Sequence, residues 1–245
     1  MSLVSTEWLE KNLKRVRIID ASWHMPISNR NAYNEYLTKH IGDAVFFNLD
    51  KSSDEISPLP HMLPDKKKWK EIISNFGIVN EDHIVIYDNS DTISSCRCWY
   101  NFIYFGHDIH KVSVLNGGLA KWIKEKRLVT DKMINFNKSN YNVVEKKNLV
   151  KNKDQIKENI ISKKFELVDA RSEERFRGLK PEPRKGLKSG NIKNSKNIPF
   201  TECLNKIDHT FKDKEELIKI FKKQDINNKK DVVFTCGSGV TACVL

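Results

Sequence analysis

A cysteine in a small loop near the end of the chain has the surroundings of a nucleophile. Cys236 follows the apolar run VVFT and precedes the segment GSGVT. Glycines adopt backbone conformations that are closed to other residues, so successive N–H groups of this loop can point at one spot. A helix beginning near Thr241 would aim its first amides at the same spot. Such a setting favours the thiolate, which is the reactive form of cysteine.

The loop also fits a buried structural cysteine beside a tight turn, because free cysteines are often buried. The chain has four other cysteines, at positions 96, 98, 203 and 243, and the odd total favours reduced thiols. Cys96 and Cys98 are expected to pack in a helix. Cys243 lies seven residues after Cys236, which argues against a disulfide between them. The cysteines form no C-x-x-C pair and no Cys/His cluster with zinc spacing, so no metal site is predicted.

The charge of the chain bears on its partners. The 245 residues carry a formal net charge of +11, but the lysines are spread widely and most lysine pairs lie beside Asn, Asp or Glu. Aromatic residues do not interleave with them as in a base-stacking surface, so nucleic acid is not an expected partner. The positive field better suits small anionic substrates. No apolar run approaches the roughly 20 residues of a membrane span, and the N-terminus resembles no targeting segment. A cytoplasmic protein is expected.

Three pairs of segments show that the chain is an internal repeat. Their members follow one another in the same order at an offset of about 150 residues. The pairs are VRIIDASWH with FELVDARSEERF, KHIGDAVFFNLD with GNIKNSKNIPF, and HIVIYDNS with DVVFTCGS. Asp88 of the first copy stands where Cys236 stands in the second, so only the second copy has the nucleophile.

Strand and helix patterns alternate along the first copy. Strands are predicted at residues 17–21, 44–49, 83–88 and 111–118, and helices at 5–13, 32–40, 65–77, 94–106 and 119–127. This alternation predicts an α/β fold, with a parallel sheet that has helices on both faces. Residues 131–153 are predicted to be a linker with one strand. The boundary is placed near Asn140, giving domains 1–135 and 141–245.

The segment CGSGVTA resembles the active-site loop of the mercaptopyruvate sulfurtransferases, within the rhodanese superfamily. The resemblance extends over essentially the whole chain and rests also on DARSEERFRGLKPEPRKGLKSG, NIPFTE, SPLPHMLP and VLNGGLAKW. It implies two tandem rhodanese-like domains, of which the first is inactive and the second carries the catalytic cysteine.

The resemblance implies a sulfur-transfer reaction. Cys236 would take sulfur from 3-mercaptopyruvate as a persulfide, release pyruvate, and pass the sulfur to a thiol acceptor. Thioredoxin or a small thiol is the expected acceptor, cyanide can serve as one, and hydrogen sulfide can result. No metal or organic cofactor is required.

Roles for other residues are carried over from the family in the same way. Arg175 and Arg184 would hold the carboxylate and ketone oxygens of the substrate, a task suited to the guanidinium fork. The loop would contribute the Ser238 hydroxyl and the substrate contacts of Gly237, Gly239, Val240 and Thr241. Asp50 and His61 match positions from which the first domain faces the cleft, and would polarise Ser238 or pass a proton. Arg171 and Arg177 are expected to form surface or interdomain ion pairs.

The residues after the cysteine bear on the choice of sulfur donor. Thiosulfate-specific relatives typically have basic residues there, whereas this chain has Gly237 and Ser238, which favours mercaptopyruvate. Related phosphatases use C-x5-R, but position 242 is alanine. Two alternatives remain open: a thiosulfate sulfurtransferase, and a catalytically silent rhodanese-like scaffold.

Two departures from the family pattern carry expectations of their own. Residues 190–195, GNIKNS, replace the usual GHIPGS, which would loosen that turn. By comparison with the first copy, about 30 to 40 residues of the second domain are expected to be missing after Leu245. Such a domain would be incomplete, of low stability and of reduced activity. The resemblance is also compatible with a mitochondrial location.

Overall fold

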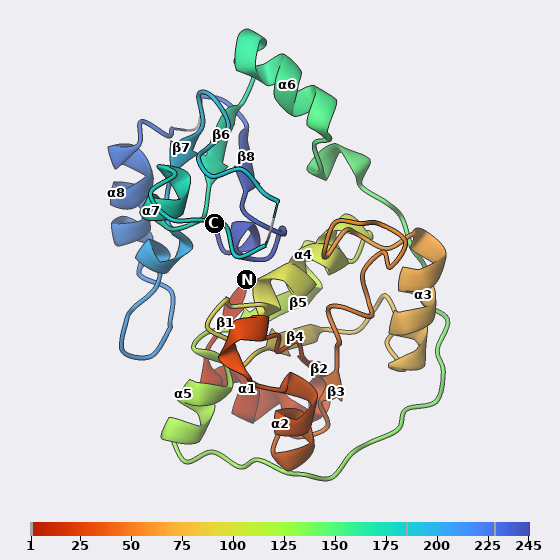
Figure 1. Ribbon diagram of the computed structural model, residues 1–245. Coiled ribbons are helices and arrows are strands. Elements are labelled where there is room, and N and C mark those ends of the chain that lie inside the picture. The colour runs from red at the N-terminus through yellow and green to blue at the C-terminus, as the bar shows by residue number, and fades with distance from the viewer. Residues whose placement is uncertain (1, 185, 228) are drawn as a thin grey trace. The chain divides into compact units, whose positions relative to one another are not determined.

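The computed structural model describes residues 2–184, 186–227 and 229–245. The chain folds into two compact units (Figure 1). The first comprises Met1–Lys147 with Asp208–Thr210, and the second comprises Asn148–Ile207 with Phe211–Leu245. No helix in the described ranges is long and apolar enough to cross a membrane.

The first unit is built on a five-stranded sheet in the order β1-β5-β4-β2-β3, in which every pairing is parallel. The strands are β1 (Leu3–Val4), β2 (Arg17–Asp20), β3 (Val45–Phe46), β4 (Ile84–Tyr87) and β5 (Val112–Leu115). The predicted parallel sheet is therefore confirmed. β3 is shorter than the predicted strand at residues 44–49. β1 was not predicted at all, because two residues are too few to show a strand period.

Helices cover both faces of this sheet (Figure 1). They are α1 (Thr6–Asn12), α2 (Ala32–Thr38), α3 (Lys66–Asn75), α4 (Ser95–Tyr104) and α5 (Gly118–Lys124), with short 3-10 turns η1 (Leu13–Arg15), η2 (Pro26–Ser28) and η3 (Ile109–Lys111). Side chains of α1, α2 and α5 share one core cluster with Val85 and Tyr87 of β4. On α3, the ring of Trp69 packs 5.1 Å from that of Phe102 of α4.

The stretch after α5 differs from the expected linker. No strand forms in residues 131–146, all of which are described. Tyr141 is fully buried, and its hydroxyl lies 3.0 Å from Nδ1 of His107 in the first unit. The predicted strand is therefore wrong. The segment runs over the first unit as an irregular chain that one buried aromatic residue anchors.

The second unit has a three-stranded sheet in the order β7-β6-β8, again parallel throughout. Its elements are η4 (Lys147–Leu149, at the division of the units), α6 (Lys153–Ser162), β6 (Glu166–Asp169), α7 (Glu173–Phe176), β7 (Lys196–Asn197), η5 (Phe200–Cys203), α8 (Lys214–Lys223), β8 (Val232–Thr235) and η6 (Thr241–Cys243). Apolar side chains of α8 pack on one face of this sheet with Val168, Ile198 and Phe234.

The strand registers confirm the internal repeat. Asp20 at the end of β2 pairs with Phe46 and Tyr87, and Asp169 at the end of β6 pairs with Asn197 and Thr235. The residue after Tyr87 is Asp88, and the residue after Thr235 is Cys236. The two copies therefore place an aspartate and a cysteine at the same point of the fold.

The two strand-ending aspartates have the same backbone turn but different side-chain partners. In each, Oδ1 accepts the backbone N–H two residues later at 2.9 Å, from Ser22 in one copy and Arg171 in the other. Burial raises the pKa of Asp20 to about 6, although hydrogen bonds from Ser22 and Tyr87 oppose the shift. In the second copy the guanidinium of Arg171 lies against Asp169, with Nη2 2.6 Å from Oδ2.

The raised pKa of Asp20 predicts a pH dependence of stability. The folded state binds the proton of Asp20 more tightly than the unfolded state does. The stability that this binding contributes is complete below the unfolded pKa of 3.8 and is lost as pH rises through about 6. Replacing Asp20 by Asn should remove about 3 kcal/mol of that decline. All five tryptophans lie in the first unit, so urea unfolding followed by tryptophan fluorescence at pH 4 to 7 measures it.

The matched control is Asp43→Asn, a change at an exposed aspartate of the same unit. As pH rises, we expect the free energy of unfolding of Asp20→Asn to increase relative to that of the wild type. The difference between Asp43→Asn and the wild type should not change with pH. Parallel pH profiles for the wild type and Asp20→Asn would contradict the assignment.

Candidate active site

Cys236 lies directly after β8, at the carboxyl end of the strand, where ligands bind in open α/β sheets. The backbone N–H of Gly239 donates to its sulfur at 3.1 Å. Gly239 has a φ of 72°, a left-handed conformation that glycine adopts without strain. The 3-10 turn η6 follows from Thr241, where the sequence predicts a helix to begin. The loop therefore turns back so that one of its own amides faces the sulfur.

Three of the four other cysteines differ from Cys236 in exposure. All five are free thiols, but Cys96, Cys98 and Cys203 are buried. Burial raises the pKa of Cys98 well above its usual value and that of Cys203 to about 11. Cys243 is partly exposed, and its thiol donates to the carbonyl of Gly239 at 3.2 Å. Cys236 is thus the partly exposed cysteine whose sulfur accepts a backbone N–H.

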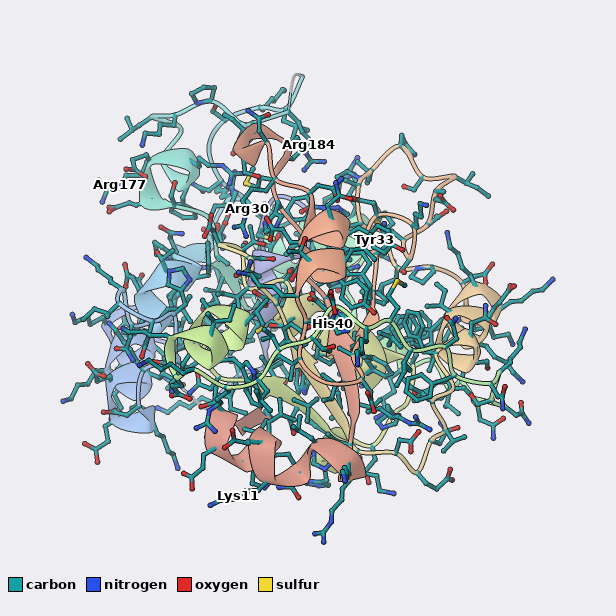
Figure 2. All side chains as sticks on the ribbon, turned by 90° about the horizontal axis from the view of Figure 1, so that it is seen from below. Lys11, Arg30, Tyr33, His40, Arg177 and Arg184 are labelled. Carbon is teal, nitrogen blue, oxygen red and sulfur yellow. The ribbon has the colours of Figure 1, made fainter. Side chains whose placement is uncertain are left out.

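Arg175 and Arg184 converge on the residue that follows Cys236. Nη2 of Arg184, which Figure 2 labels, donates to the carbonyl oxygen of Gly237. A Cβ atom on Gly237 would lie 3.1 Å from Nη2 of Arg175 and 3.9 Å from Nη2 of Arg184. The structure therefore brings together the two arginines and the loop that the sequence singled out. Because glycine has no Cβ, Nη2 of Arg175 can lie close to the Cα of Gly237.

Arg171 contradicts the expectation of a surface or interdomain ion pair, because it is nearly buried and both its partners lie in the second unit. Its side chain is only 10% exposed and is held between two carboxylates, with Nη2 2.6 Å from Asp169 and Nη1 2.7 Å from Glu182. Glu182 also binds Arg175. Sequence reasoning missed Glu182, although its place in the PEPR segment was the available signal. Arg177 does lie on the surface (Figure 2), where it pairs with Glu173 at 2.7 Å.

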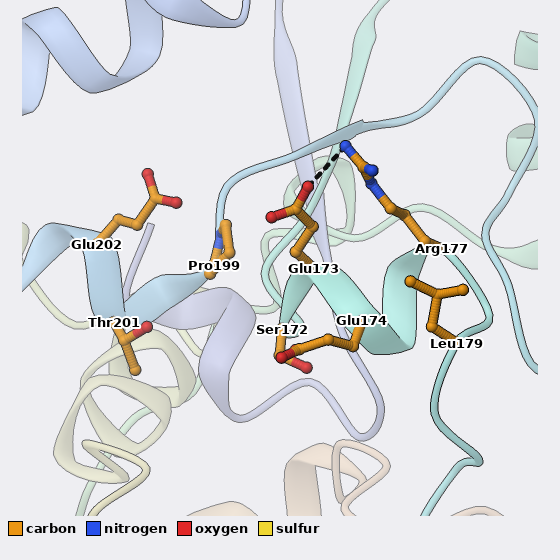
Figure 3. A pocket seen from close by; sticks show the side chains of 8 residues that line it. All are labelled: Ser172, Glu173, Glu174, Arg177, Leu179, Pro199, Thr201 and Glu202. Atoms are coloured by element: carbon orange, nitrogen blue, oxygen red, sulfur yellow. Dashed lines mark ion pairs between the residues drawn. The ribbon is translucent and has the colours of Figure 1, made fainter.

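The outer side of α7 borders a pocket that is separate from this cluster (Figure 3). The Glu173–Arg177 ion pair lies on its wall. The residues that line it are Ser172, Glu173, Glu174, Arg177, Leu179, Pro199, Thr201 and Glu202. Neither Cys236 nor Arg175 is among them, so the pocket carries none of the groups that the sequence proposes for chemistry.

The remaining loop residues have distinct surroundings. Gly237, Ser238 and Thr241 are partly exposed, whereas Val240 is only 2% exposed. The carbonyl of Val240 accepts the N–H of Cys243 at 3.1 Å. No cluster of three or more His, Cys, Asp or Glu side chains fit to hold a metal ion occurs within the described ranges.

Asp50 and His61 form a pair inside the first unit. Nε2 of His61 lies 2.9 Å from Oδ1 of Asp50, and the Trp23 indole N–H donates to the same carboxylate at 3.2 Å. The hydrogen bond from His61 lowers the pKa of Asp50, although partial burial opposes the shift. His61 is 7% exposed, and Arg97 donates to its backbone carbonyl. Its Nδ1 has no hydrogen-bond partner in the described part of the chain.

The rhodanese-like domain model matches residues 5–125 and 152–245, which is most of the chain and both copies of the repeat. This chain belongs to the rhodanese family. The family assignment and the two-copy α/β fold inferred from the sequence are therefore confirmed.

Relatives within the rhodanese family include enzymes with two different donor names. The chain is 38% identical to the 3-mercaptopyruvate sulfurtransferase of Mus musculus over 250 residues, covering 99% of this chain and 83% of the relative. It is also 38% identical to the thiosulfate sulfurtransferase of Rattus norvegicus over 251 residues, with the same coverages. Overall identity therefore does not separate the two donors, and the residues around the cysteine must do so.

Solved structures agree with the rhodanese assignment. SseA of Escherichia coli, described as a 3-mercaptopyruvate sulfotransferase, superposes with a TM-score of 0.90 at 31% identity and covers 100% of this chain and 91% of its own. Tum1 of Saccharomyces cerevisiae also gives a TM-score of 0.90, at 28% identity, covering 100% of this chain and 87% of its own.

The differences among the cysteines predict an order of alkylation. Under native conditions iodoacetamide should modify Cys236 first, because it is partly exposed and its sulfur accepts a backbone N–H, whereas the partly exposed Cys243 uses its thiol as a hydrogen-bond donor. Cys98 and Cys203 should react only after unfolding, since burial disfavours their thiolates. Peptide mass mapping during brief alkylation measures the order. The fast phase should vanish in Cys236→Ser, and equal rates at Cys203 and Cys236 would refute it.

Proposed function

We propose that this rhodanese-family protein is a sulfurtransferase that takes sulfur from 3-mercaptopyruvate through a persulfide on Cys236. The observation that carries the proposal is the grouping at the end of β8. There the sulfur of Cys236 accepts the Gly239 N–H, while Arg184 and Arg175 converge on Gly237. A cysteine whose neighbouring residue is reached by two arginines suits a substrate carrying both an attackable sulfur and a carboxylate.

The chemistry needs no oxidant. The Cys236 thiolate attacks the sulfur of mercaptopyruvate, forming an S–S bond while the C–S bond breaks. The electron pair of that bond leaves on carbon as the enolate of pyruvate, which takes up a proton to become pyruvate. The persulfide left on Cys236 carries negative charge, which the loop amides and the Ser238 hydroxyl stabilise.

The surroundings of Gly237 support a keto-acid donor. Arginine forks bind planar carboxylates with two parallel hydrogen bonds, and Arg175 and Arg184 reach the loop from another segment of the chain. A side chain at position 237 would begin 3.1 Å from Nη2 of Arg175, so Arg175 would have to shift by a few tenths of an ångström. Thiosulfate, a dianion with no carboxylate, makes less use of this pair of forks. We therefore favour mercaptopyruvate although relatives of both names are equally similar.

The second half-reaction returns the cysteine to its starting state. A thiol acceptor attacks the outer sulfur of the persulfide, which transfers as a new persulfide and frees the Cys236 thiolate. A dithiol such as thioredoxin then closes its own disulfide and releases hydrogen sulfide. A small thiol keeps the sulfur as its own persulfide. Cyanide takes the outer sulfur and becomes thiocyanate. The proposed compartment is the cytoplasm. A relative from Arabidopsis thaliana is named as mitochondrial, so cell fractionation is the direct test.

Intact-mass spectrometry tests the first half-reaction. After brief exposure of the purified chain to 3-mercaptopyruvate, we expect a gain of about 32 Da, one sulfur atom, on Cys236. The Cys236→Ser variant should gain nothing. A chain that gains no sulfur from mercaptopyruvate or from thiosulfate, although its Cys236 is alkylated rapidly, would be a rhodanese-like scaffold and not an enzyme.

A parallel arm with thiosulfate separates the two donors. At equal concentrations we expect persulfide to form faster with mercaptopyruvate. Faster loading with thiosulfate would replace the proposed donor while keeping Cys236 as the sulfur carrier.

For Asp50 and His61 we propose a part in proton transfer. The support is their own chemistry within the first unit. A buried imidazole whose Nε2 is paired with a carboxylate is held in one orientation. Its Nδ1 has no hydrogen-bond partner among the described residues and can exchange a proton with a ligand. Asp50 is charged at neutral pH, and the hydrogen bond from His61 lowers the pKa of its carboxyl further.

This proposal predicts a loss of turnover. His61→Gln should lower kcat about 100-fold, a usual share for general acid–base catalysis, and Asp50→Asn should lower it less. The matched control is Glu55→Gln, which removes an exposed ion pair with Lys68 in the same loop region and should leave kcat unchanged. Steady-state rates with mercaptopyruvate measure all three. A wild-type kcat in His61→Gln would exclude the role.

A further inference from the structure

The cluster behind the two substrate arginines has a layout that sulfur transfer itself does not require. Glu182 has a side chain only 4% exposed and binds two arginines at once. Its Oε1 accepts from Arg171 at 2.7 Å and from Nε of Arg175 at 3.2 Å, and its Oε2 accepts from Nη2 of Arg175 at 2.5 Å. Arg175 is therefore gripped along one edge of its guanidinium group.

The grip leaves a defined part of Arg175 for another ligand. A guanidinium carries five N–H groups, one on Nε and two on each terminal nitrogen. Glu182 uses the Nε group and one on Nη2. The edge formed by Nη1 and Nη2, the fork that binds carboxylates in pairs, is not used by Glu182, and Nη2 lies against Gly237.

Glu182 is itself held from behind. Arg171 is 10% exposed and binds Glu182 with Nη1, while its Nε and Nη2 bind Asp169, whose side chain is 3% exposed. Nη2 of Arg171 also donates to the carbonyl of Gly190 at 2.7 Å. The side chains form a line of alternating charge that starts at the end of β6 and ends at Arg175.

The two copies of the repeat differ at this point. Both have an Asp-Ala pair at the end of the strand, Asp20-Ala21 and Asp169-Ala170. The next residue is Ser22 in the first copy and Arg171 in the second. The first copy has Asp88 in place of the nucleophile. The arginine that anchors Glu182 thus occurs in the copy that carries Cys236.

We infer that Glu182, anchored by Arg171, is a positioning residue that turns the open fork of Arg175 toward the carboxylate of a keto-acid substrate beside Cys236. The inference deepens the proposed function and rests on it for the identity of the substrate. In the opposite arrangement, Glu182 would compete with the substrate for Arg175. The geometry argues against competition, since Glu182 takes the Nε edge and leaves the fork.

Two alkylating agents with matched skeletons test the positioning without any sulfur transfer. Bromopyruvate has the carbon frame of mercaptopyruvate with bromine in place of the thiol, and bromoacetone lacks its carboxylate. With each, the Cys236 thiolate forms a C–S bond as bromide leaves. The ratio of the two rates measures the grip on a carboxylate, and the bromoacetone rate alone shows that the loop is intact.

We expect the wild type to react faster with bromopyruvate, and Glu182→Gln to lower the rate ratio about tenfold, the effect of one misdirected charge-assisted pair. Glu182→Asp keeps the charge but shortens the arm, so it should also lower the ratio. In steady-state assays both variants should raise KM for mercaptopyruvate more than they change kcat. Glu173→Gln, which breaks the exposed pair with Arg177 on the same helix, is the matched control and should leave the ratio unchanged.

The outcomes separate the alternatives. A higher ratio in Glu182→Gln would mean competition or a purely electrostatic effect, because the change adds one positive charge to the site, and it would overturn the inference. An unchanged ratio, or no preference for bromopyruvate in the wild type, would overturn it as well. A lowered ratio in a chain that forms no persulfide would support the positioning and reject the proposed sulfur transfer. If Glu182→Gln folds poorly, Arg171→Gln loosens the same anchor and should lower the ratio in the same direction.

Discussion

The hydrogen bond from the backbone N–H of Gly239 to the sulfur of Cys236 is the contact on which the candidate active site depends. Gly239 can donate to Cys236 because its φ of 72° turns the loop back on itself. A residue with a Cβ would add about 1 kcal/mol of strain there. Since β6 and β8 are parallel, their carboxyl ends share one edge of the sheet, and Asp169 ends β6 at the edge where Cys236 follows β8. Strand pairing thus places the origin of the charged line near the nucleophile.

The missing side chain at Gly237 is the second constraint. Positive charge beside the cysteine comes from Arg175 and Arg184, more than 50 residues earlier in the chain, and not from the loop itself. A cation delivered from a separate segment can be aimed by that segment's own contacts. A lysine or arginine within the loop would move with it. In this arrangement the loop donates its hydrogen bond to the sulfur of Cys236, and residues of another segment orient the carboxylate of the substrate.

Sequence patterns predicted the parts of the fold that short-range rules govern. The strand that ends at Asp20 and the repeat both follow from local patterns, and the structure has them where expected. The course of residues 131–146 did not follow, because Tyr141 is buried by partners distant in sequence. Arg171 was misjudged for the same reason. Its partner Glu182 lies in the PEPR segment, which has no helical or strand period, so the sequence could mark Glu182 without indicating which charge it meets.

The comparison of the two copies argues that stability alone does not explain the charged line. Buried ion pairs gain little net stability, because desolvation offsets much of their attraction. The first copy shows that the fold tolerates the strand-ending aspartate without an arginine: Asp20 takes hydrogen bonds from Ser22 and Tyr87, and burial raises its pKa. In the second copy Arg171 forms ion pairs with the corresponding aspartate, Asp169, and with Glu182. The second copy, which holds the nucleophile, thus has a polar network that the shared fold does not need for stability. Such a network is expected where the orientation of a substrate matters more than stability.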